Sequence, residues 1–401
     1  MLLLSLQKRV AISVGLMVLM LFILATARRF AYPFLPVFME DFNLSAFAAT
    51  VLIAATQVPA VIGILWGPLG DKYGYQRLMT AGILIMFIGF ISFVVTQSYF
   101  TLLLALFAAG LGKNIYDPNG QACANSNVAR KYRGLVTGVL ETGWALSTLI
   151  GVPLVTLLIY HFSWRAPFLV LAVAAMFLII TLRLILPADQ KQLVQVNLLQ
   201  TYKDAFGSML HNKAIWGLAL FFFCVGFAND SVFISYSRWL DASFHMGYVA
   251  VGIGTAIIGA AELCGELTTA FIAERVGYRR LFSIVLVLAA VVTALLTVAG
   301  VTPALAWILL FGAFFGAEAL IVTGFAYAQD FLPGQRSTIL SLAFTATNIG
   351  RIAGIFSGSG FWALGGMRLV SVASASAMVL ALVFLVLLTF NHKPANNNII
   401  S

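Results

Sequence analysis

The feature that most limits how this chain can fold is a series of apolar segments, each close to the roughly 20 residues that a helix needs to cross a bilayer. Examples are residues 10–27, 78–95, 135–159, 168–186 and 281–299. Hydrophobic residues make up 61% of the 401 residues and charged residues only 9%, with a mean hydropathy of +1.00. A soluble domain of this composition would expose far too much apolar surface. We therefore predict an all-α integral membrane protein.

The apolar segments predict twelve transmembrane helices joined by short connections. Their approximate limits are 10–38, 47–66, 78–97, 99–122, 135–158, 166–186, 214–236, 248–273, 281–301, 305–328, 338–362 and 369–390. The first apolar run begins after Lys8 and Arg9 and continues past Arg29 without a small-residue cleavage site, which favours a membrane span over a signal peptide. No soluble domain of ordinary size fits in the residues that remain.

The excess of positive charge is explained by membrane topology. The chain has 23 Lys and Arg residues against 14 Asp and Glu residues, a formal net charge of +9. Most basic residues fall in loops and tails on one side of the predicted spans, and the predicted outer loops contain only Arg165, Arg238 and Arg368. This positive-inside pattern places both termini in the cytoplasm. The charge therefore indicates a lipid bilayer and no nucleic acid as partner, and the small loops favour a bacterial inner membrane.

The sequence contains no pattern typical of a cofactor or a metal site. The three cysteines, Cys123, Cys224 and Cys264, are far apart in the chain and fall in or beside apolar segments. The four histidines are scattered over loops and the tail, and no phosphate-binding loop is present. We therefore expect no cofactor, no metal ion and no enzymatic activity, and we expect an ion or solute gradient as the energy source.

A polar interruption divides the chain into two groups of six spans. The longest such stretch, residues 188–213, separates the sixth predicted span from the seventh. We predict an N-terminal six-helix half at 1–190, a cytoplasmic linker at 191–213 and a C-terminal six-helix half at 214–401.

An internal repeat supports this division. An offset of 203 residues carries the segment DKYGYQRL at 71–78 onto ERVGYRRL at 274–281. The same offset relates two further pairs, Arg133 with Arg336 and Gly151 with Gly354. Parallel repeats of this kind imply two pseudo-symmetric halves related by an axis along the membrane normal, with the solute site between them.

The loop between the second and third predicted spans resembles a known family. Its sequence, GPLGDKYGYQR at 67–77, is similar to the signature G-x-L-x-D-[RK]-x-G-x-[RK]-[RK] of the major facilitator superfamily, and the second half keeps a weaker copy. The resemblance covers essentially the whole chain. It implies the major facilitator fold and secondary transport by alternating access.

The resemblance also implies that this loop latches the cytoplasmic ends of the two halves. Its glycines permit a tight turn and close approach of helices. Asp71 can accept hydrogen bonds, and the neighbouring cations lie at the anionic leaflet. The alternative is charge that only sets the topology. The residues that we assign to the latch are Gly67, Gly70, Asp71, Lys72, Gly74, Arg77, Arg133 and Glu141.

Charged side chains inside the predicted spans are candidates for binding solute or protons. Each costs at least about 2.5 kcal/mol at the bilayer centre unless it faces protein or water, so a purely structural bundle has little reason to keep many. They are Arg28, Arg29, Lys113, Asp117, Glu141, Asp230, Glu262, Glu266, Glu318 and Arg351.

Arg28 and Arg29 are the first candidates for substrate binding. Consecutive helical residues point about 100° apart, so we expect only one of them to face a given cavity. The offset of 203 carries Arg28 onto Ser231, next to Asp230. We predict that one arginine binds an anionic group of the substrate or pairs with Asp230 during transport, and a permanent structural ion pair is the alternative. The further candidates for substrate binding are Lys113 and Arg351.

Four carboxylates are candidates for proton coupling. Glu262 and Glu266 are four residues apart and share a helical face. Two nearby carboxylates in a low dielectric cannot both ionise cheaply, so we expect one to hold a proton. The alternative is a pair with Arg351 or a place in the headgroup zone. The second candidate is Glu318, which Arg351 could neutralise, and the remaining one is Asp117.

Lys113 and Asp117 are four residues apart in the fourth predicted span. We predict an intrahelical ion pair between them, with a substrate or proton role as the alternative. Aromatic side chains in the spans, among them Trp144 and Tyr327, are candidates for an apolar cavity wall.

These features favour a monomeric, proton-coupled exporter of a small amphipathic drug or metabolite. Gly143 and the Gly-Val-Pro at 151–153 resemble a remnant of the family's exporter motif in the fifth span, and charges of both signs lie among many aromatic residues. One alternative is a proton symporter that imports a small organic anion held by Arg28 or Arg29. Another is a non-transporting receptor or sensor, although the chain lacks a sizeable soluble domain to relay a signal.

Overall fold

The computed structural model describes residues 2–31, 34–126, 128–185, 202–203, 207, 212–244, 248–298, 302–332 and 335–390. Within these ranges every regular element is a helix, as the apolar segments predict. The predicted linker at 191–213 falls largely outside the described residues. The helices form two compact units, Met1–Ala129 with Val139–Gln195 and Arg130–Gly138 with Val196–Ser401.

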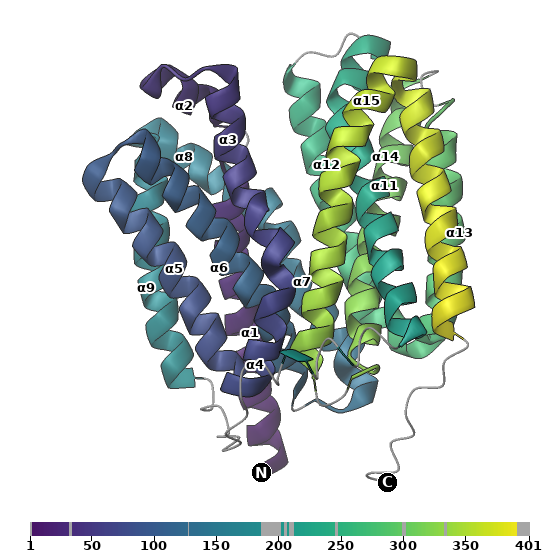
Figure 1. The fold of residues 1–401 in the computed structure, drawn as a ribbon, viewed down its shortest axis with the longest axis horizontal. Coiled ribbons are helices and arrows are strands. Elements are labelled where there is room, and N and C mark those ends of the chain that lie inside the picture. The colour runs from purple at the N-terminus through teal and green to yellow at the C-terminus, as the bar shows by residue number, and fades with distance from the viewer. Residues whose placement is uncertain are drawn as a thin grey trace. The chain divides into compact units, whose positions relative to one another are not determined.

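The first unit is built around α6, which packs against α1, α3 and α5 (Figure 1). Its elements are α1 (Leu2–Arg29), α2 (Leu35–Phe42), α3 (Ala46–Gln57), the 3-10 helix η1 (Val58–Leu65), α4 (Trp66–Tyr73), α5 (Tyr75–Thr96), α6 (Tyr99–Ser126), the part of α7 (Arg133–Leu146) from Val139, the π-helix η3 (Ser147–Gly151), α8 (Val152–His161) and α9 (Ala166–Ile185).

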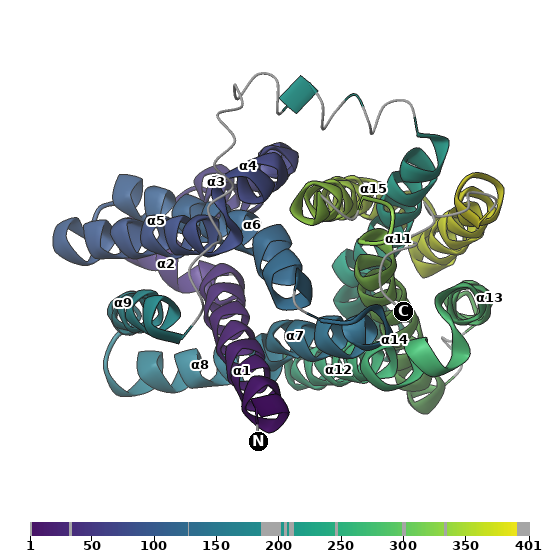
Figure 2. The same cartoon turned by 90° about the horizontal axis from the view of Figure 1, so that it is seen from below.

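In the second unit α15 packs against α11 and α13, and α14 packs against α12 and α13 (Figure 2). Its elements are η2 (Arg130–Tyr132), the start of α7, α11 (Lys213–Phe244), α12 (Tyr248–Val276), α13 (Tyr278–Leu295), α14 (Pro303–Ala328), α15 (Arg336–Phe384) and the π-helix η5 (Leu385–Phe390).

The described residues contain 11 helical segments that are long and apolar enough to cross a membrane. The last of them, Arg336–Leu387, has 52 residues and would be about 78 Å long if straight, far more than a bilayer core. Its backbone leaves the helical conformation at Gly365 and Gly366, where Gly366 has φ 60° and ψ −155°. Side chains with a Cβ rarely adopt that conformation. The segment therefore supplies two spans, in agreement with the twelve that were predicted.

The first span differs from its prediction as one continuous helix over 10–38. α1 ends at Arg29, and α2 begins at Leu35 with Pro36 in its first turn. A proline nitrogen cannot donate the hydrogen bond that would continue a helix through it. Arg28 and Arg29 form the last turn of α1, where the helix dipole favours positive charge.

The internal repeat is confirmed in the backbone. Gly74 after α4 and Gly277 after α12, which are 203 residues apart, have φ values of 102° and 87°. The N–H of Gly74 donates to the carbonyl of Gly70, and the N–H of Gly277 donates to that of Ala273, both at 2.9 Å. The same turn thus follows the corresponding helix in each unit.

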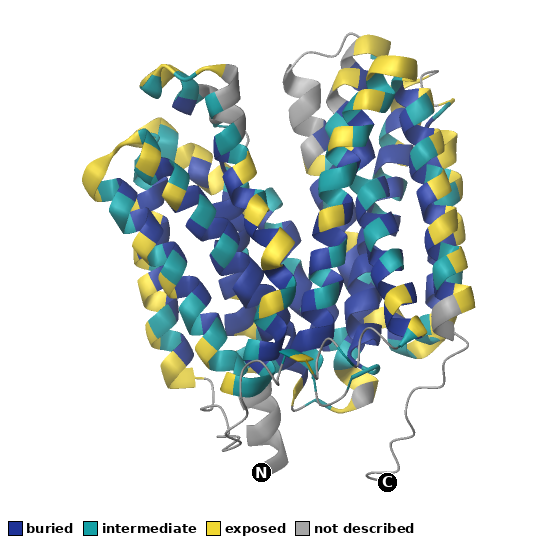
Figure 3. Ribbon diagram, viewed as in Figure 1, coloured by how far each residue is buried: buried dark blue, intermediate teal, exposed yellow. Residues whose placement is uncertain are grey.

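Helices such as α13 have exposed residues on one face and buried residues on the other (Figure 3), and large apolar side chains occur on both. On α13 the exposed large side chains are Ile284, Val287, Leu288, Val291 and Leu295. The buried ones on the same helix are Leu281, Phe282, Val285 and Leu286. A helix that is hydrophobic all round suits a lipid environment.

A stripe of glycines holds α15 against α11. Gly350, Gly354 and Gly358 lie one turn apart, and a Cβ on each would meet the backbone of Phe223, Phe227 and Ser231, respectively. Ser231 Oγ also donates to the carbonyl of Gly354 at 3.2 Å. Small residues let membrane helices approach closely without a hydrophobic driving force. The stripe fixes the register in which α11 and α15 present their polar side chains.

We expect Gly354→Leu to destabilise the second unit by about 1–3 kcal/mol, because the new side chain must push α15 away from the backbone of α11. Thermal unfolding of the purified protein in detergent measures this. Gly360→Leu is the matched control on the same helix, since a Cβ there meets nothing within 4 Å. Equal effects of the two substitutions would contradict the packing role of the stripe.

Candidate functional site

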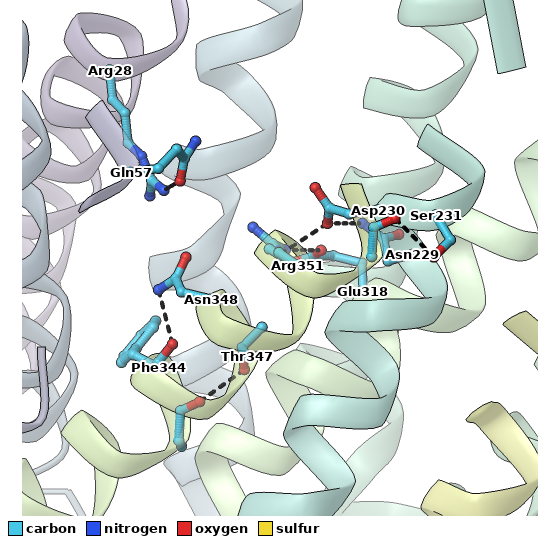
Figure 4. A network of polar contacts seen from close by, with 12 residues as sticks. Arg28, Gln57, Asn229, Asp230, Ser231, Glu318, Phe344, Thr347, Asn348 and Arg351 are labelled. Atoms are coloured by element: carbon cyan, nitrogen blue, oxygen red, sulfur yellow. Dashed lines mark hydrogen bonds and ion pairs between the residues drawn. The ribbon is translucent and has the colours of Figure 1, made fainter. Parts of the chain in front are cut away.

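A three-residue charge cluster joins three helices of the second unit: Asp230 on α11, Glu318 on α14 and Arg351 on α15 (Figure 4). Arg351 Nε lies 3.4 Å from Asp230 Oδ2, and Arg351 Nη2 lies 4.0 Å from Glu318 Oε2. Asn229 Nδ2 donates to Asp230 Oδ2 at 3.2 Å. The structure therefore contains the predicted neutralisation of Glu318 by Arg351 and adds Asp230 as a second acidic partner.

Close helix packing explains how these side chains meet. Gly226 of α11 lies against the backbone of Thr347 and Arg351, because a Cβ at this position would meet their carbonyl and amide groups. The glycine stripe continues this contact beyond Arg351. The shortened distance between the helices lets the guanidinium of α15 reach a carboxylate of α11.

One guanidinium cannot neutralise two carboxylates. The side chains of Arg351, Asp230 and Glu318 are only 18%, 15% and 5% exposed, so water screens their charges poorly. With all three groups ionised their charges sum to one negative charge, and Arg351 is shared between acidic groups on two different helices.

Two further glutamates lie on α12, which packs against α14. Glu262 and Glu266 on α12 are buried. Gly265 between them touches α14, since its Cβ position is 2.8 Å from the carbonyl of Phe315 and 3.1 Å from Cβ of Glu318. The contact between α12 and α14 thus brings glutamates of both helices to one interface. One turn further along it, the hydroxyls of Thr269 and Thr323 lie 2.9 Å apart.

The first unit contains the predicted ion pair within α6. Lys113 Nζ and Asp117 Oδ2 are 2.6 Å apart, and both side chains are buried. The pair is confirmed, because residues four apart on one helix lie on the same face whatever surrounds them.

Trp144, at the end of α7, brings two cations together. The guanidinium carbon of Arg29 is 3.5 Å from the centroid of the indole ring, and Lys113 Nζ is 4.6 Å from it. Arg29 Nη1 also donates to the carbonyl of Trp144 at 3.3 Å and to the hydroxyl of Thr148 in η3. Gly143 permits this arrangement, since it lies against the backbone of Val18 and lets α7 approach α1.

The remaining predicted charges of the first unit have amide partners. Arg28 donates to Oε1 of Gln57, the last residue of α3 (Figure 4). Glu141 Oε1 accepts a hydrogen bond from Gln121 Nε2, and both residues are buried. The structure thus places Glu141 on the contact between α6 and α7. Its assignment to the latch remains a prediction.

The charges predicted inside the spans divide unequally between the units. In the described part of the first unit the basic members are Arg28, Arg29 and Lys113, and the acidic ones are Asp117 and Glu141. In the described part of the second unit the acidic members are Asp230, Glu262, Glu266 and Glu318, and the basic one is Arg351. Among these intramembrane charges, basic residues are therefore in excess in the first unit and acidic residues in the second.

Comparison with known proteins identifies the fold. The model of the Major Facilitator Superfamily matches residues 17–261 and 219–401. The chain belongs to this superfamily. It is 24% identical over 347 residues to YceJ of Bacillus subtilis (strain 168), an uncharacterized MFS-type transporter, covering 83% of this chain and 85% of YceJ.

Two other proteins that are similar to this chain are named for different transport functions. The multi-drug resistance efflux pump PmrA of Streptococcus pneumoniae serotype 4 is 27% identical over 263 residues, which are 62% of this chain and 64% of the pump. The structure of the proton:xylose symporter XylE matches with a TM-score of 0.79, at 13% identity and over 96% of each chain. The superfamily and fold make this protein a multi-pass secondary transporter of the plasma membrane with a small-molecule substrate.

The loop with the superfamily signature, residues 67–77, is held in place by hydrogen bonds within the first unit. Tyr75 Oη donates to Asp71 Oδ1 at 2.8 Å, and Gln76 Nε2 donates to the carbonyl of Leu182 at 3.2 Å. Gly67 and Gly70 are buried in α4, and Arg77 is exposed. These contacts fix the loop but do not test the latch.

The start of α7 is bound by two segments of the second unit. The N–H of Gly134 donates to Oε1 of Glu274, in the repeat of the loop, at 2.8 Å, and Arg133 Nη1 pairs with Oδ1 of Asp330, which follows α14, at 2.8 Å. Glu274 is the counterpart of Asp71 in the repeat. Arg133, predicted as a latch residue, therefore has its ion pair within the second unit.

Proposed function

We propose that this transporter exports a small amphipathic solute in exchange for protons. The observation that carries the proposal is the sharing of Arg351 between Asp230 and Glu318. Because two carboxylates on different helices compete for one guanidinium, protonation of either of them would change which one Arg351 pairs with.

The cluster also supplies a way to couple that proton to movement. Its members come from α11, α14 and α15, so a change in the partner of Arg351 changes the forces between these three helices. Protonation of Glu318 would leave Arg351 to pair fully with Asp230, and loss of the proton would restore the competition. A two-state element of this kind can be biased by both protons and solute.

The direction of transport is supported by the similarity to PmrA, which is named as an efflux pump, and by the remnant of the exporter motif around Gly143. An exporter driven by the proton gradient releases protons on the side from which it takes its solute.

The test uses inverted membrane vesicles whose interior is acidified, with a pH-sensitive dye and a panel of cationic, neutral and anionic compounds. We expect proton release when a transported compound is added. Glu318→Gln should abolish the release. Asp41→Asn is the control, because it removes a carboxylate that forms an exposed ion pair with Arg165. Undiminished release in Glu318→Gln, or no release with any compound, would contradict proton antiport.

A second candidate is a proton symporter that imports an organic anion. It is favoured by the three basic residues inside the first unit, Arg28, Arg29 and Lys113. Accumulation of solute in whole cells that express the protein would select this function, whereas exclusion of solute would select export. Purified protein in liposomes that moves no solute would favour a receptor or sensor instead.

A further inference from the structure

One face of α6 carries a row of four polar side chains spaced four residues apart: Lys113, Asp117, Gln121 and Asn125. Residues at this spacing share a helical face, with a rise of about 6 Å from each to the next. All four residues are buried, with at most 4% of their surface exposed. Buried polar groups are normally hydrogen-bonded, so each donor and acceptor of this row needs a partner.

Contacts on either side of the middle of the row satisfy most of these groups. Lys113 Nζ pairs with Asp117 Oδ2 at 2.6 Å. Further along, Gln121 Nε2 donates to Glu141 Oε1 on α7, and Asn125 Nδ2 donates to the carbonyl of Gln121 at 3.0 Å. The place that these contacts do not bridge lies between the side chains of Asp117 and Gln121.

Two acceptor oxygens remain at that place. No hydrogen-bond donor among the described residues reaches Asp117 Oδ1 or Gln121 Oε1, and both atoms are shielded from solvent. A carboxylate oxygen and an amide oxygen both accept hydrogen bonds, so they cannot bond to each other. A molecule with two donor hydrogens can join them.

Pro118 adds a third acceptor and opens the helix at the same place. It lies inside α6, between Asp117 and Gln121 in the chain. Its nitrogen has no hydrogen to donate to the carbonyl of Asn114, and its ring displaces that carbonyl from the regular helical position. Helical carbonyls point toward the C-terminal end of their helix, so this one points toward the turn that contains Asp117.

Water fits these acceptors better than a metal ion does. Two hydrogen bonds to one water molecule join oxygens that are up to about 5.6 Å apart, which suits side chains one helical turn from each other. A buried water typically makes about three hydrogen bonds. A metal ion needs several ligands around one point, and the described residues contain no group of three or more His, Cys, Asp or Glu side chains that could supply them.

From these observations we infer that α6 binds a water molecule between Asp117 Oδ1 and Gln121 Oε1, and that Gln121 is the residue that positions it. The water completes a hydrogen-bonded path from Glu141 on α7 to the ion pair on α6. The inference deepens the proposed function and rests on it for the use of protons. A hydronium ion that reaches this place gives one proton to Asp117 Oδ1, which becomes a carboxylic acid, and remains as the neutral bridging water.

A crystal structure of the purified full-length protein, at a resolution that shows ordered water, tests the site directly. We expect electron density for a water within hydrogen-bond distance of both oxygens. Gln121→Met keeps the length of the side chain but removes its oxygen, so its structure should lack this water. Asn119→Leu is the matched control and should keep it. Asn119 is a buried amide on the opposite face of α6, where its Nδ2 donates to the carbonyl of Ile115.

The role of Gln121 in proton transfer is measured in the vesicle assay. Gln121→Met should slow compound-driven proton release by about tenfold or more, because the water loses one of its acceptors. Exchange of labelled for unlabelled solute at equal pH needs no net proton movement and should continue. Gln121→Asn should recover part of the proton release, since it keeps an amide oxygen. A glutamine that only filled space would be replaced better by methionine, which has the same length, than by the shorter asparagine.

Three results would overturn the inference. They are a protein donor or an ion in the place of the water, a water that persists in Gln121→Met, and equal rates of proton release in Gln121→Met and Asn119→Leu. If Gln121→Met does not fold, Lys113→Met with Asp117→Leu removes the other acceptor, and its structure should lack the water too. A wild type that releases no protons would contradict antiport, whereas the electron density would still decide whether the water is bound.

Discussion

Arg351→Gln is expected to lower the free energy of unfolding of the second unit by about 3–5 kcal/mol. The substitution leaves Asp230 and Glu318 on adjacent helices without the guanidinium that they share. Two poorly solvated carboxylates then repel each other, and one must bind a proton or the helices must separate. Thermal unfolding in detergent measures the loss of stability, and the vesicle assay should show that proton-driven transport is lost as well.

A triple variant separates these two effects. Arg351→Gln combined with Asp230→Asn and Glu318→Gln removes every charge of the cluster, so most of the stability should return. Transport driven by protons should remain absent, because no carboxylate of the cluster can carry one. Recovery of transport in this variant would show that the cluster only stabilises the fold.

The second large effect is expected in the first unit. Lys113→Met should also destabilise the protein by about 3–5 kcal/mol, because it leaves Asp117 buried without its partner 2.6 Å away. Adding Asp117→Leu should restore stability, since a buried ion pair is often no more stable than well-packed apolar side chains. Thermal unfolding of the single and double variants measures both steps.

The surface pair of Arg165 and Asp41 provides the comparison. Their side chains are 38% and 33% exposed, so Arg165→Met should cost at most about 1 kcal/mol. If Lys113→Met cost no more than this, Asp117 would not be left as an uncompensated buried charge, and the prediction would be wrong.

The sequence alone predicted the features that depend on residues close together in the chain. The apolar segments predicted the membrane helices because length and composition alone decide whether a helix can span a bilayer. The repeat at Gly74 and Gly277 predicted the same turn in both units, because a turn with positive φ favours glycine at that one position. The pair of Lys113 and Asp117 followed from helical spacing.

Contacts between distant helices were harder to predict. Arg351 and Asp230 are 121 positions apart, and their pairing depends on how α11 and α15 are rotated. The glycines at 350, 354 and 358 indicate a packing face, but not which helix fills it. Trp144 was predicted only as part of an apolar wall, since nothing in its sequence neighbourhood indicates that Arg29 and Lys113 meet there.

The unequal division of charge between the units bears on how such a protein arises. A transporter made by duplicating one ancestral half would begin with two identical charge sets. A chain with two copies of the present first unit would bury an excess of cations, and one with two copies of the second would bury an excess of carboxylates. The repeat that still shapes both backbones therefore carries a different set of intramembrane charges in each unit.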